Sequence, residues 1–472
     1  MKKYKILLPI SVICIFFFTS SFDFPRFRKD KPIHQRIRPY RIHSINHGQS
    51  PRIGEERYAS DRVLVKFKPT LSTQMIETTI DAYRVKKIKR IPLLDLYLLE
   101  VPPYSTVEET VHALRLNPDV DHVSPDYKTY ITAVPKPTDN FFNWQYYLYN
   151  EGQEIGFPGP RGKNRADIKA LEAWEETKGE SEVVVAVIDT GVDFDHPDLE
   201  GKIYSSGYDF VNSDEDAADD HGHGTFVSGL IAAKSNNGEG IAGVNWHSRI
   251  LPLKAVESDG TGYVSWLIQA IIYAVTEGKG YLGEGETNPV DVISMSLGFS
   301  LGENEAVGDL EDALELARTN GIVCVASAGN EGSGVLYPAA YDDYCIAVAA
   351  TDYNDFRPSW SNFGPQVDIA APGARIVGPV PTWLPGLIWN DFTLPPYGFG
   401  DGTSASAAIV SGFVALLKSI KPWLEPDEIM DIIRYSADDV NGNEYPGDDE
   451  FIGSGRINMK KALVPIKISR LK

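Results

Sequence analysis

Hydrophobic residues follow one pattern in the larger, C-terminal part of the chain. Short runs rich in Val, Ile and Ala carry little polar alternation there, which is typical of strands buried on both faces. These runs are EVVVAVIDTG, RILPLKAV, DVISMSLG, GIVCVASAGN and CIAVAAT. Between them, VSWLIQAIIYAVTEG and EDALELARTNG have helical spacing, and Gly321 closes the second segment as a C-cap would. This alternation predicts an α/β fold in which a parallel central sheet carries helices on both faces.

Residues 61–131 show a different pattern. DRVLVKFKP and LLDLYLLEVP alternate as strands do, STVEETVHALRLNP has helical spacing behind a Ser/Thr cap, and VDHVSPDY alternates again. Strands and helices in so short a stretch predict a small α+β domain. The Pro-broken segment 132–138 would connect this domain to the larger one, residues 139–472.

The N-terminus has the pattern of an export signal. Three lysines among the first five residues precede the apolar run Ile6–Phe18, and small polar residues follow it. We therefore predict a signal peptide over residues 1–22, and a secreted protein without a membrane span once the signal is removed. An uncleaved anchor is the alternative, although the run is short for a bilayer. Residues 23–60 carry scattered Pro and Arg without any period, which predicts a basic disordered linker.

Charge and cysteine content narrow the function classes. The first sixty residues contain twelve Lys or Arg against four acids, so the formal charge of −20 for 472 residues becomes −28 for the remainder. That acidity argues against nucleic acid as a partner, since phosphate binding needs a concentrated basic face. Of the three cysteines, Cys14 lies in the predicted signal, while Cys324 and Cys345 lie in apolar runs. Whether these two form a disulfide or stay as buried thiols is left open.

Three chemically important side chains stand where strands end or helices begin, which is where sites gather in parallel sheets. Asp189 ends the strand in VIDTGVDFDHPDL, His223 stands in DDHGHGTFVSG, and Ser404 opens the apolar helix in GDGTSASAAIVSGFVALLK. An Asp, a His and a Ser are the parts for nucleophilic acyl transfer. The Ser attacks, the His takes and returns its proton, and the Asp fixes the imidazole tautomer. The three lie 34 and 181 residues apart, so only folding can assemble them.

Simpler interpretations exist for the same residues. His221 and His223 with Asp219 and Asp220 could bind zinc, but no second ligand cluster accompanies them, and the acids suit a helix N-terminus. Ser404 alone could be a helix N-cap. An α/β-hydrolase is disfavoured, because that fold uses a Gly-x-Ser-x-Gly elbow and the order Ser, Asp, His.

Together, the three motifs resemble those of the subtilisin-like serine proteases, or subtilases. VIDTGVDFDHPDL is similar to the family's aspartate motif, HGTFVSG to its histidine motif and GTSASAAIVSG to its serine motif, in the family's order. The resemblance runs from about Asp139 to Asn458. It implies that Asp189, His223 and Ser404 form the catalytic triad of a serine endopeptidase, which acts on protein or peptide substrates without a catalytic metal.

The resemblance also assigns residues around the triad. Asn330, in SAGNEG, matches the asparagine whose side-chain amide joins the Ser404 backbone N–H in the oxyanion hole. The substrate-binding residues would be Ser296, Leu297, Gly298, Gly260, Gly262, Ala328 and Gly329. None of these brings a charge, although Glu331 could stand at the pocket rim. We therefore expect a preference for large apolar residues before the scissile bond.

A structural calcium ion is a further implication of the resemblance. Asp139, Asp198 and Asn236 match positions at which many subtilases place side-chain ligands. Oxygen donors from loops are what Ca²⁺ takes. Each residue could instead be a solvated loop position.

The domain at residues 61–131 resembles the inhibitor-like propeptide of secreted subtilases, through VLVKFKP and VDHVSPDY. The resemblance implies that it assists folding, acts as an intramolecular inhibitor and is removed by self-cleavage between Tyr130 and Asp139. The mature enzyme is expected to be a monomer. The chain departs from the family at Phe226, at Ala405 and Ala408, and in the long aromatic segment 379–400. For that segment the sequence leaves open a lid, a substrate wall or a protein contact.

Overall fold

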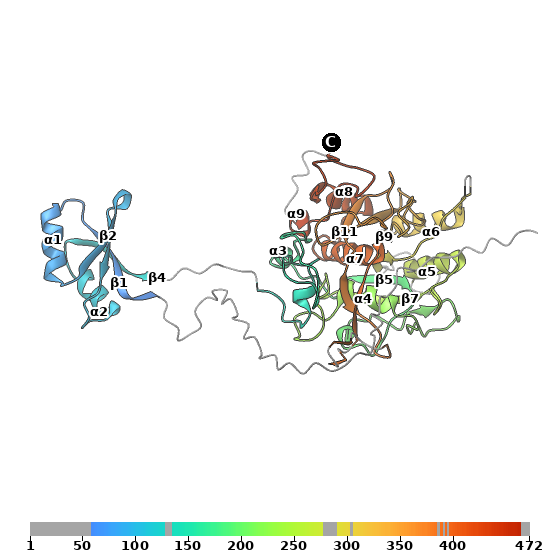
Figure 1. Cartoon of the computed structure of the whole chain (residues 1–472), viewed down its shortest axis with the longest axis horizontal. Coiled ribbons are helices and arrows are strands. Elements are labelled where there is room, and N and C mark those ends of the chain that lie inside the picture. Colours follow the sequence, from blue (N-terminus) through green and yellow to red (C-terminus); the bar gives the residue numbers. More distant parts are fainter. Residues whose placement is uncertain are drawn as a thin grey trace, which may run out of the picture. The chain divides into compact units, whose positions relative to one another are not determined.

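The computed structural model describes residues 58–127, 135–276, 290–302, 305–384, 388–389, 392–393 and 396–463. The predicted signal peptide and residues 23–57 of the predicted linker lie outside these ranges. So do residues 128–131 of the predicted first domain, residues 132–134 of the connector, and residues 385–387, 390–391 and 394–395 of segment 379–400. The chain divides between residues 134 and 135 into two compact units, each of which can be followed in Figure 1.

The first unit has the predicted α+β composition. Its antiparallel sheet has the order β2-β3-β1-β4, with β1 (Tyr58–Phe67), β2 (Lys86–Ile91), β3 (Leu96–Glu100) and β4 (Val120–Tyr127). Two helices pack on this sheet, α1 (Thr73–Ala82) and α2 (Val107–Arg115). The predicted cap of α2 is present, because Thr106 Oγ1 accepts from the Glu109 N–H at 3.2 Å and the Glu109 carboxylate accepts from the Thr106 N–H at 3.0 Å.

Two boundaries in this unit differ from the sequence expectation. The first strand begins at Tyr58, three residues before the predicted start of the domain. The run LLDLYLLEVP supplies a shorter strand than its alternation predicts, since Pro92–Leu94 form a 3-10 turn and Asp95 has a left-handed φ of 50°. A proline at the first turn position and a short polar residue able to adopt φ > 0 explain why the strand starts only at Leu96.

The second unit is built on the predicted parallel sheet. In the described residues this sheet has seven strands in the order β11-β10-β9-β8-β5-β7-β6. Their bounds are β5 (Val184–Asp189), β6 (Tyr208–Asp209), β7 (Arg249–Lys254), β8 (Val290–Met295), β9 (Val323–Ser327), β10 (Cys345–Thr351) and β11 (Ile369–Pro372). The five apolar runs of the sequence correspond to β5, β7, β8, β9 and β10, so their assignment as buried strands is confirmed.

Helices cover both faces of this sheet, as predicted. On one face, α4 (His223–Ala232) and α7 (Thr403–Ile420) pack against each other and against the strands. On the other, α5 (Val264–Thr276) and α6 (Gly308–Thr319) pack together (Figure 1). Every residue of β5 is buried, because alternate side chains face the two helical layers. Gly321 follows α6 with a φ of 76°, which confirms its predicted role at the helix end.

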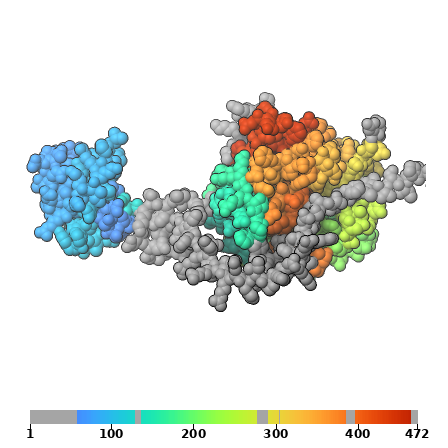
Figure 2. Space-filling view, viewed as in Figure 1, coloured from blue at the N-terminus to red at the C-terminus, as the bar shows by residue number. Residues whose placement is uncertain are grey.

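The two ends of the second unit lie side by side. Helix α3 (Ala170–Trp174) packs on α9 (Met459–Leu463), and the Met459 N–H donates to the Ile168 carbonyl oxygen at 2.9 Å. Helix α8 (Pro426–Ser436) also contacts α9. On the face shown in Figure 2, this C-terminal segment, in red, meets the turquoise N-terminal segment of the same unit.

One helix and one cysteine pair resolve points that composition left open. Among the described residues, only Thr403–Ile420 is long and apolar enough to span a membrane, and 89% of that window is buried inside the second unit, as in a core helix. Cys324 and Cys345 are opposite partners on β9 and β10 and are buried free thiols. Burial raises the pKa of the Cys345 thiol, which keeps it protonated.

A short antiparallel ladder connects this sheet to the start of α7. It pairs β12 (Ile376–Pro379) with β15 (Tyr397–Gly400), from which the chain runs directly to Thr403. A second, two-residue pairing joins β13 (Ile388–Trp389) to β14 (Phe392–Thr393). The ladder therefore fixes the approach of the chain to Ser404.

Candidate active site

A buried carboxylate and an imidazole meet at the carboxyl end of strand β5, in the interior of the parallel sheet. Asp189 is the last residue of β5 and is completely buried, and His223 is the first residue of α4. The His223 Nδ1 atom lies 2.7 Å from Asp189 Oδ1 and 3.0 Å from Oδ2, while the Thr190 N–H donates to Oδ1 at 2.8 Å. A carboxylate on Nδ1 holds the proton there and leaves Nε2 as the basic nitrogen.

Opposing effects set the pKa of His223. Burial alone would lower it, but the charge and hydrogen bond of Asp189 together outweigh burial, with a further contribution from Asp219, and the pKa is raised. The pKa of the adjacent His221 is lowered, chiefly by burial and then by His223. The pKa values of the two histidines are thus shifted in opposite directions, and His223 is the one hydrogen-bonded to Asp189.

Asp219 organises the turn that presents His223. Its buried carboxylate accepts from the N–H groups of His221, Gly222 and Thr225 at 3.0, 2.8 and 2.9 Å, and from the Thr225 hydroxyl at 2.6 Å. It also accepts from the Thr190 hydroxyl at 2.8 Å, which joins this turn to the end of β5. Asp219 is therefore a helix-capping group whose oxygens are occupied by protein donors, and this arrangement opposes a zinc site.

The Lys254 side chain also joins the end of β5 to the turn before α4. Its side chain, at the end of β7, is only 1% exposed. The ammonium donates to the Thr190 carbonyl oxygen at 3.0 Å, to the Val256 carbonyl oxygen at 2.9 Å and to Asp220 Oδ1 at 2.6 Å. A buried ammonium needs this number of acceptors. Sequence reasoning missed Lys254, and its one signal was a lysine inside an otherwise apolar buried strand.

Ser404 lies at the N-terminus of α7, the helix that packs against α4. Its hydroxyl donates to the Ser296 carbonyl oxygen at 3.2 Å, and the Ser296 hydroxyl donates in turn to the Ser404 carbonyl oxygen at 3.0 Å. Asn330 Oδ1 accepts from the Thr403 N–H at 2.8 Å and from the Thr403 hydroxyl at 3.1 Å. Because its oxygen accepts both bonds, the Asn330 side chain is held beside Thr403, the residue before Ser404.

The predicted pocket residues converge on one apolar side chain. A Cβ atom on Gly298 would lie 2.9 Å from Leu336 Cβ, and one on Gly329 would lie 2.9 Å from Leu336 Cδ1. Ser296 and Leu297 precede Gly298 directly after β8, and Ala328 precedes Gly329 directly after β9. Glu331 Oε2 also lies near Gly329, where it accepts from the Asn330 N–H and from Asn362 Nδ2, both at 2.9 Å.

The segment containing Gly260 and Gly262 forms a turn after β7. The Glu257 N–H donates to the Thr261 carbonyl oxygen at 2.7 Å, and Val256 pairs with Gly262 in an antiparallel bridge. Hydrogen bonds from Thr261 lower the pKa of Asp259, and His221 contributes to the same effect. The charge effect of His221 on Asp259 places this turn in the neighbourhood of the histidine turn.

Asp139, Asp198 and Asn236 come together from three separate loops. The Asn236 N–H donates to Asp139 Oδ2 at 2.8 Å, and the Ile241 N–H donates to Asp198 Oδ2 at 2.9 Å. The second oxygen of each carboxylate, Asp139 Oδ1 and Asp198 Oδ1, is buried without a hydrogen-bond partner in the described residues. Burial first, and the charge of Asp139 as a lesser cause, raise the pKa of Asp198 to about 7. Two orphaned buried carboxylate oxygens fit a hard cation.

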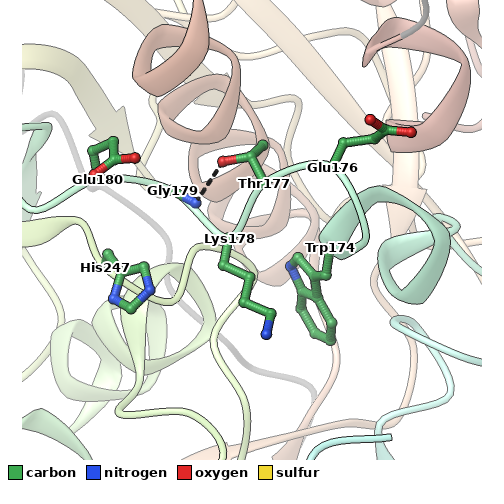
Figure 3. Close-up of a pocket in the computed structure, with 7 residues that line it drawn as sticks. All are labelled: Trp174, Glu176, Thr177, Lys178, Gly179, Glu180 and His247. Atoms are coloured by element: carbon green, nitrogen blue, oxygen red, sulfur yellow. Dashed lines mark hydrogen bonds between the residues drawn. The ribbon is translucent and has the colours of Figure 1, made fainter. Parts of the chain in front are cut away.

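A surface pocket of 370 Å³ lies elsewhere on this unit (Figure 3). It is lined by Trp174, Glu176, Thr177, Lys178, Gly179, Glu180 and His247. None of these is a predicted site residue. Its hydrogen bond from the Gly179 N–H to the Thr177 hydroxyl, at 3.1 Å, orders the loop between α3 and β5.

Comparison with known proteins places both units in families. The profile of the subtilase family matches residues 180–455, and that of the fervidolysin N-terminal prodomain matches residues 46–126. The chain is 35% identical to the thermophilic serine proteinase of Bacillus sp. (strain AK1), over 86% of this chain and 88% of that protein. It is also 35% identical to thermitase of Thermoactinomyces vulgaris, over 63% of this chain and 93% of thermitase.

The chain belongs to the subtilase family. A solved structure titled as a protease from Pseudoalteromonas arctica superposes on it with a TM-score of 0.56 at 29% identity, covering 70% of this chain and 98% of that one. The first unit of this subtilase is accordingly a prodomain and the second its peptidase domain. The predictions of fold, family and enzyme class are confirmed.

The departure at Phe226 has a structural explanation in this subtilase. The ring lies on α4, one turn beyond His223, against two glycines of the β12–β15 ladder. A Cβ atom on Gly378 would lie 2.6 Å from the Phe226 ring, and one on Gly400 would lie 3.1 Å from it. The aromatic ring thus fills space that the glycines leave between the histidine helix and the strand leading to Ser404.

The pKa of His223 can be measured directly. Proton NMR titration of the folded protein in a Ser404→Ala background, which avoids autolysis, should give an imidazole pKa above the ordinary value of about 6.5. Asp189→Asn removes the charge that raises this pKa, so the value should fall below that of the parent. Asp216→Asn, at an exposed acid, is the matched control and should leave it unchanged. A parent pKa below 6.5 would contradict the assignment of Asp189 as the dominant partner.

Proposed function

We propose that this subtilase is a secreted serine endopeptidase that cleaves peptide bonds through an acyl-enzyme. The observation that carries the proposal is the 2.7 Å contact between His223 Nδ1 and Asp189, with Ser404 opening the helix packed against α4. Ser404 attacks the scissile carbonyl, and His223 accepts the hydroxyl proton on Nε2 and returns it to the leaving amine. Asp189 keeps the tautomer that makes this transfer possible.

The negative charge that forms on the carbonyl oxygen needs fixed donors. We assign this role to the Asn330 amide and the Ser404 backbone N–H. Support comes from Thr403, whose N–H and hydroxyl both donate to Asn330 Oδ1 and so hold the carboxamide beside the N-terminus of α7. Donors positioned before the reaction stabilise the intermediate without a reorganisation cost.

Substrate would bind as an extended strand between Ser296–Gly298 and Gly260–Gly262. The pocket for the residue before the scissile bond would be lined by Ala328 and Gly329, with Leu336 as its apolar wall. Gly329 is required here, because its φ is 110° and a Cβ would lie 2.3 Å from Asn362 Nδ2 and 2.9 Å from Leu336 Cδ1. Because the Glu331 carboxylate is already engaged by Asn330 and Asn362, we propose a preference for large apolar residues.

The proposed precursor has the organisation predicted from the sequence. Residues 1–22 would direct export, 23–60 link the signal to the prodomain, and 132–138 contain the self-cleavage site before the peptidase domain. The prodomain match supports an intramolecular inhibitor that also assists folding. A parallel sheet with many non-local pairings folds slowly, so a folding template has a physical purpose.

Removal of the nucleophile tests this proposal. The Ser404→Ala chain should retain its prodomain, and its hydrolysis of casein should fall by more than about a thousandfold. Ser406→Ala alters a buried hydroxyl on the same helix that donates to the Ala371 carbonyl oxygen, and this variant should still mature. The measurement is gel analysis of processing in the isolated chain together with a proteolysis assay. Full maturation and digestion by Ser404→Ala would overturn the proposal.

We also propose a structural calcium ion at Asp139, Asp198 and Asn236. These residues would supply carboxylate and amide oxygens, while the loop 234–241 could add carbonyl oxygens. Each of the two carboxylates has one buried oxygen without a hydrogen-bond partner in the described residues, and a bound cation would neutralise their charge. It would thereby hold the start of the peptidase domain against the loop that follows α4.

Calcium should therefore stabilise the inactive Ser404→Ala protein. At a concentration about a hundredfold above Kd, the gain is about 2.7 kcal/mol, which should raise Tm by several degrees in a thermal melt. Asp198→Asn should abolish this calcium-dependent shift, whereas Asp216→Asn, at an exposed acid outside the proposed site, should retain it. A shift of equal size in all three proteins would place the ion elsewhere.

A further inference from the structure

The start of the aromatic segment 379–400 lies lengthwise along the helix of the catalytic histidine. A Cβ atom on Gly229 would lie 2.1 Å from Pro379 Cγ. A Cβ atom on Gly222, the residue before His223, would lie 3.0 Å from Leu384 Cδ1 and 3.1 Å from Pro381 Cδ. The contacts between α4 and β12 show the same packing (Figure 1). The segment therefore runs back along α4 until it reaches the N-terminus of that helix.

Asp193 anchors this segment beside the Asp189–His223 pair. The N–H and the hydroxyl of Thr382 both donate to Asp193 Oδ2, at 2.6 and 2.8 Å. Asp193 follows Asp189 by four residues, and its own N–H donates to the Thr225 hydroxyl at 2.9 Å. Residues 381–384 are thus fixed to both elements that carry the catalytic pair.

Trp383 lies between these two anchor points and is 54% exposed. Thr382 is held by Asp193, and Leu384 packs against Gly222. The backbone at Trp383 is therefore already restrained, so binding of a partner to the indole costs little backbone entropy. A large, rigid, exposed aromatic side chain on a fixed segment is a typical anchor for a peptide partner. Trp383 is thus held between a contact with Gly222, the residue before His223, and a contact with Asp193.

We propose that Trp383 is a specificity-determining residue that contacts the substrate beyond the scissile bond. Residues before the bond are assigned to the turn at Gly260–Gly262 and to Ser296–Gly298. Trp383 and Leu384, over the buried Pro381, form a wall next to Gly222 and Asp193, and we assign the departing half of the substrate to this wall. This wall favours large apolar or aromatic residues there. The inference rests on the proposed endopeptidase function.

Two peptides that differ at one position test the inference. They share one sequence before the scissile bond and carry Phe or Ala directly after it. Trp383→Ala should lower the ratio of kcat/KM for the Phe peptide over the Ala peptide about tenfold, mainly through KM for the Phe peptide. Trp383→Phe keeps an aromatic surface and should retain most of the parent ratio.

A second exposed tryptophan provides the matched control. Trp423, 71% exposed in the loop between α7 and α8, lies outside the proposed wall, and Trp423→Ala should keep the parent ratio. Thermal melts establish that each variant is folded. An unchanged ratio in folded Trp383→Ala, with a parent that cleaves both peptides, would overturn the inference alone. A parent that cleaves neither peptide would overturn the proposed function and this inference with it.

Discussion

The hydrogen bond between His223 and a fully buried Asp189 is the interaction on which the rest of the site depends. An isolated carboxylate at the end of β5 would be expensive to desolvate, so it persists only where donors surround it. The imidazole Nδ1 and the Thr190 N–H are those donors. The same burial that makes the carboxylate costly also strengthens its effect on His223, whose pKa rises despite its own desolvation.

The Asp189–His223 pair is held in place by the hydrogen bonds of Thr190. Its hydroxyl accepts from the Gly224 N–H at 2.9 Å and donates to Asp219, while its carbonyl oxygen accepts from Lys254. One residue after the strand therefore connects three segments: the turn before α4, the first turn of α4 and the end of β7. Because these contacts restrain all three segments, the carboxylate and the imidazole are positioned before any substrate arrives.

The sequence predicted those features that repeat locally or that match a family motif. Long buried strands were recognisable because both of their faces are apolar, whereas β6 and β11 are only two and four residues long and carry no readable period. The triad candidates could be named from three motifs. Their supporting contacts could not, since Lys254 bonds to Thr190 across 64 positions and Thr382 to Asp193 across 189. Only the folded chain shows such pairs.

Departures from the family motifs required the structure for the same reason. In the sequence, Phe226 is only a departure from the family motif. In the structure, its ring occupies space that is open because Gly378 and Gly400 have no Cβ atom. The acids before His223 were expected to act through the helix dipole. Asp219 instead accepts specific hydrogen bonds, while Asp220 pairs with Lys254. Both acids thus make structural contacts, as the sequence indicated, but Asp219 and Asp220 bond to different groups.

The most direct test of this account is the site and rate of covalent labelling by a fluorophosphonate, which reacts with an activated serine. Peptide mapping by mass spectrometry should find the adduct on Ser404, and His223→Ala should slow its formation about a hundredfold or more, because the general base is lost. An adduct on another serine, or an equal rate in folded His223→Ala, would contradict the claim that His223 activates Ser404.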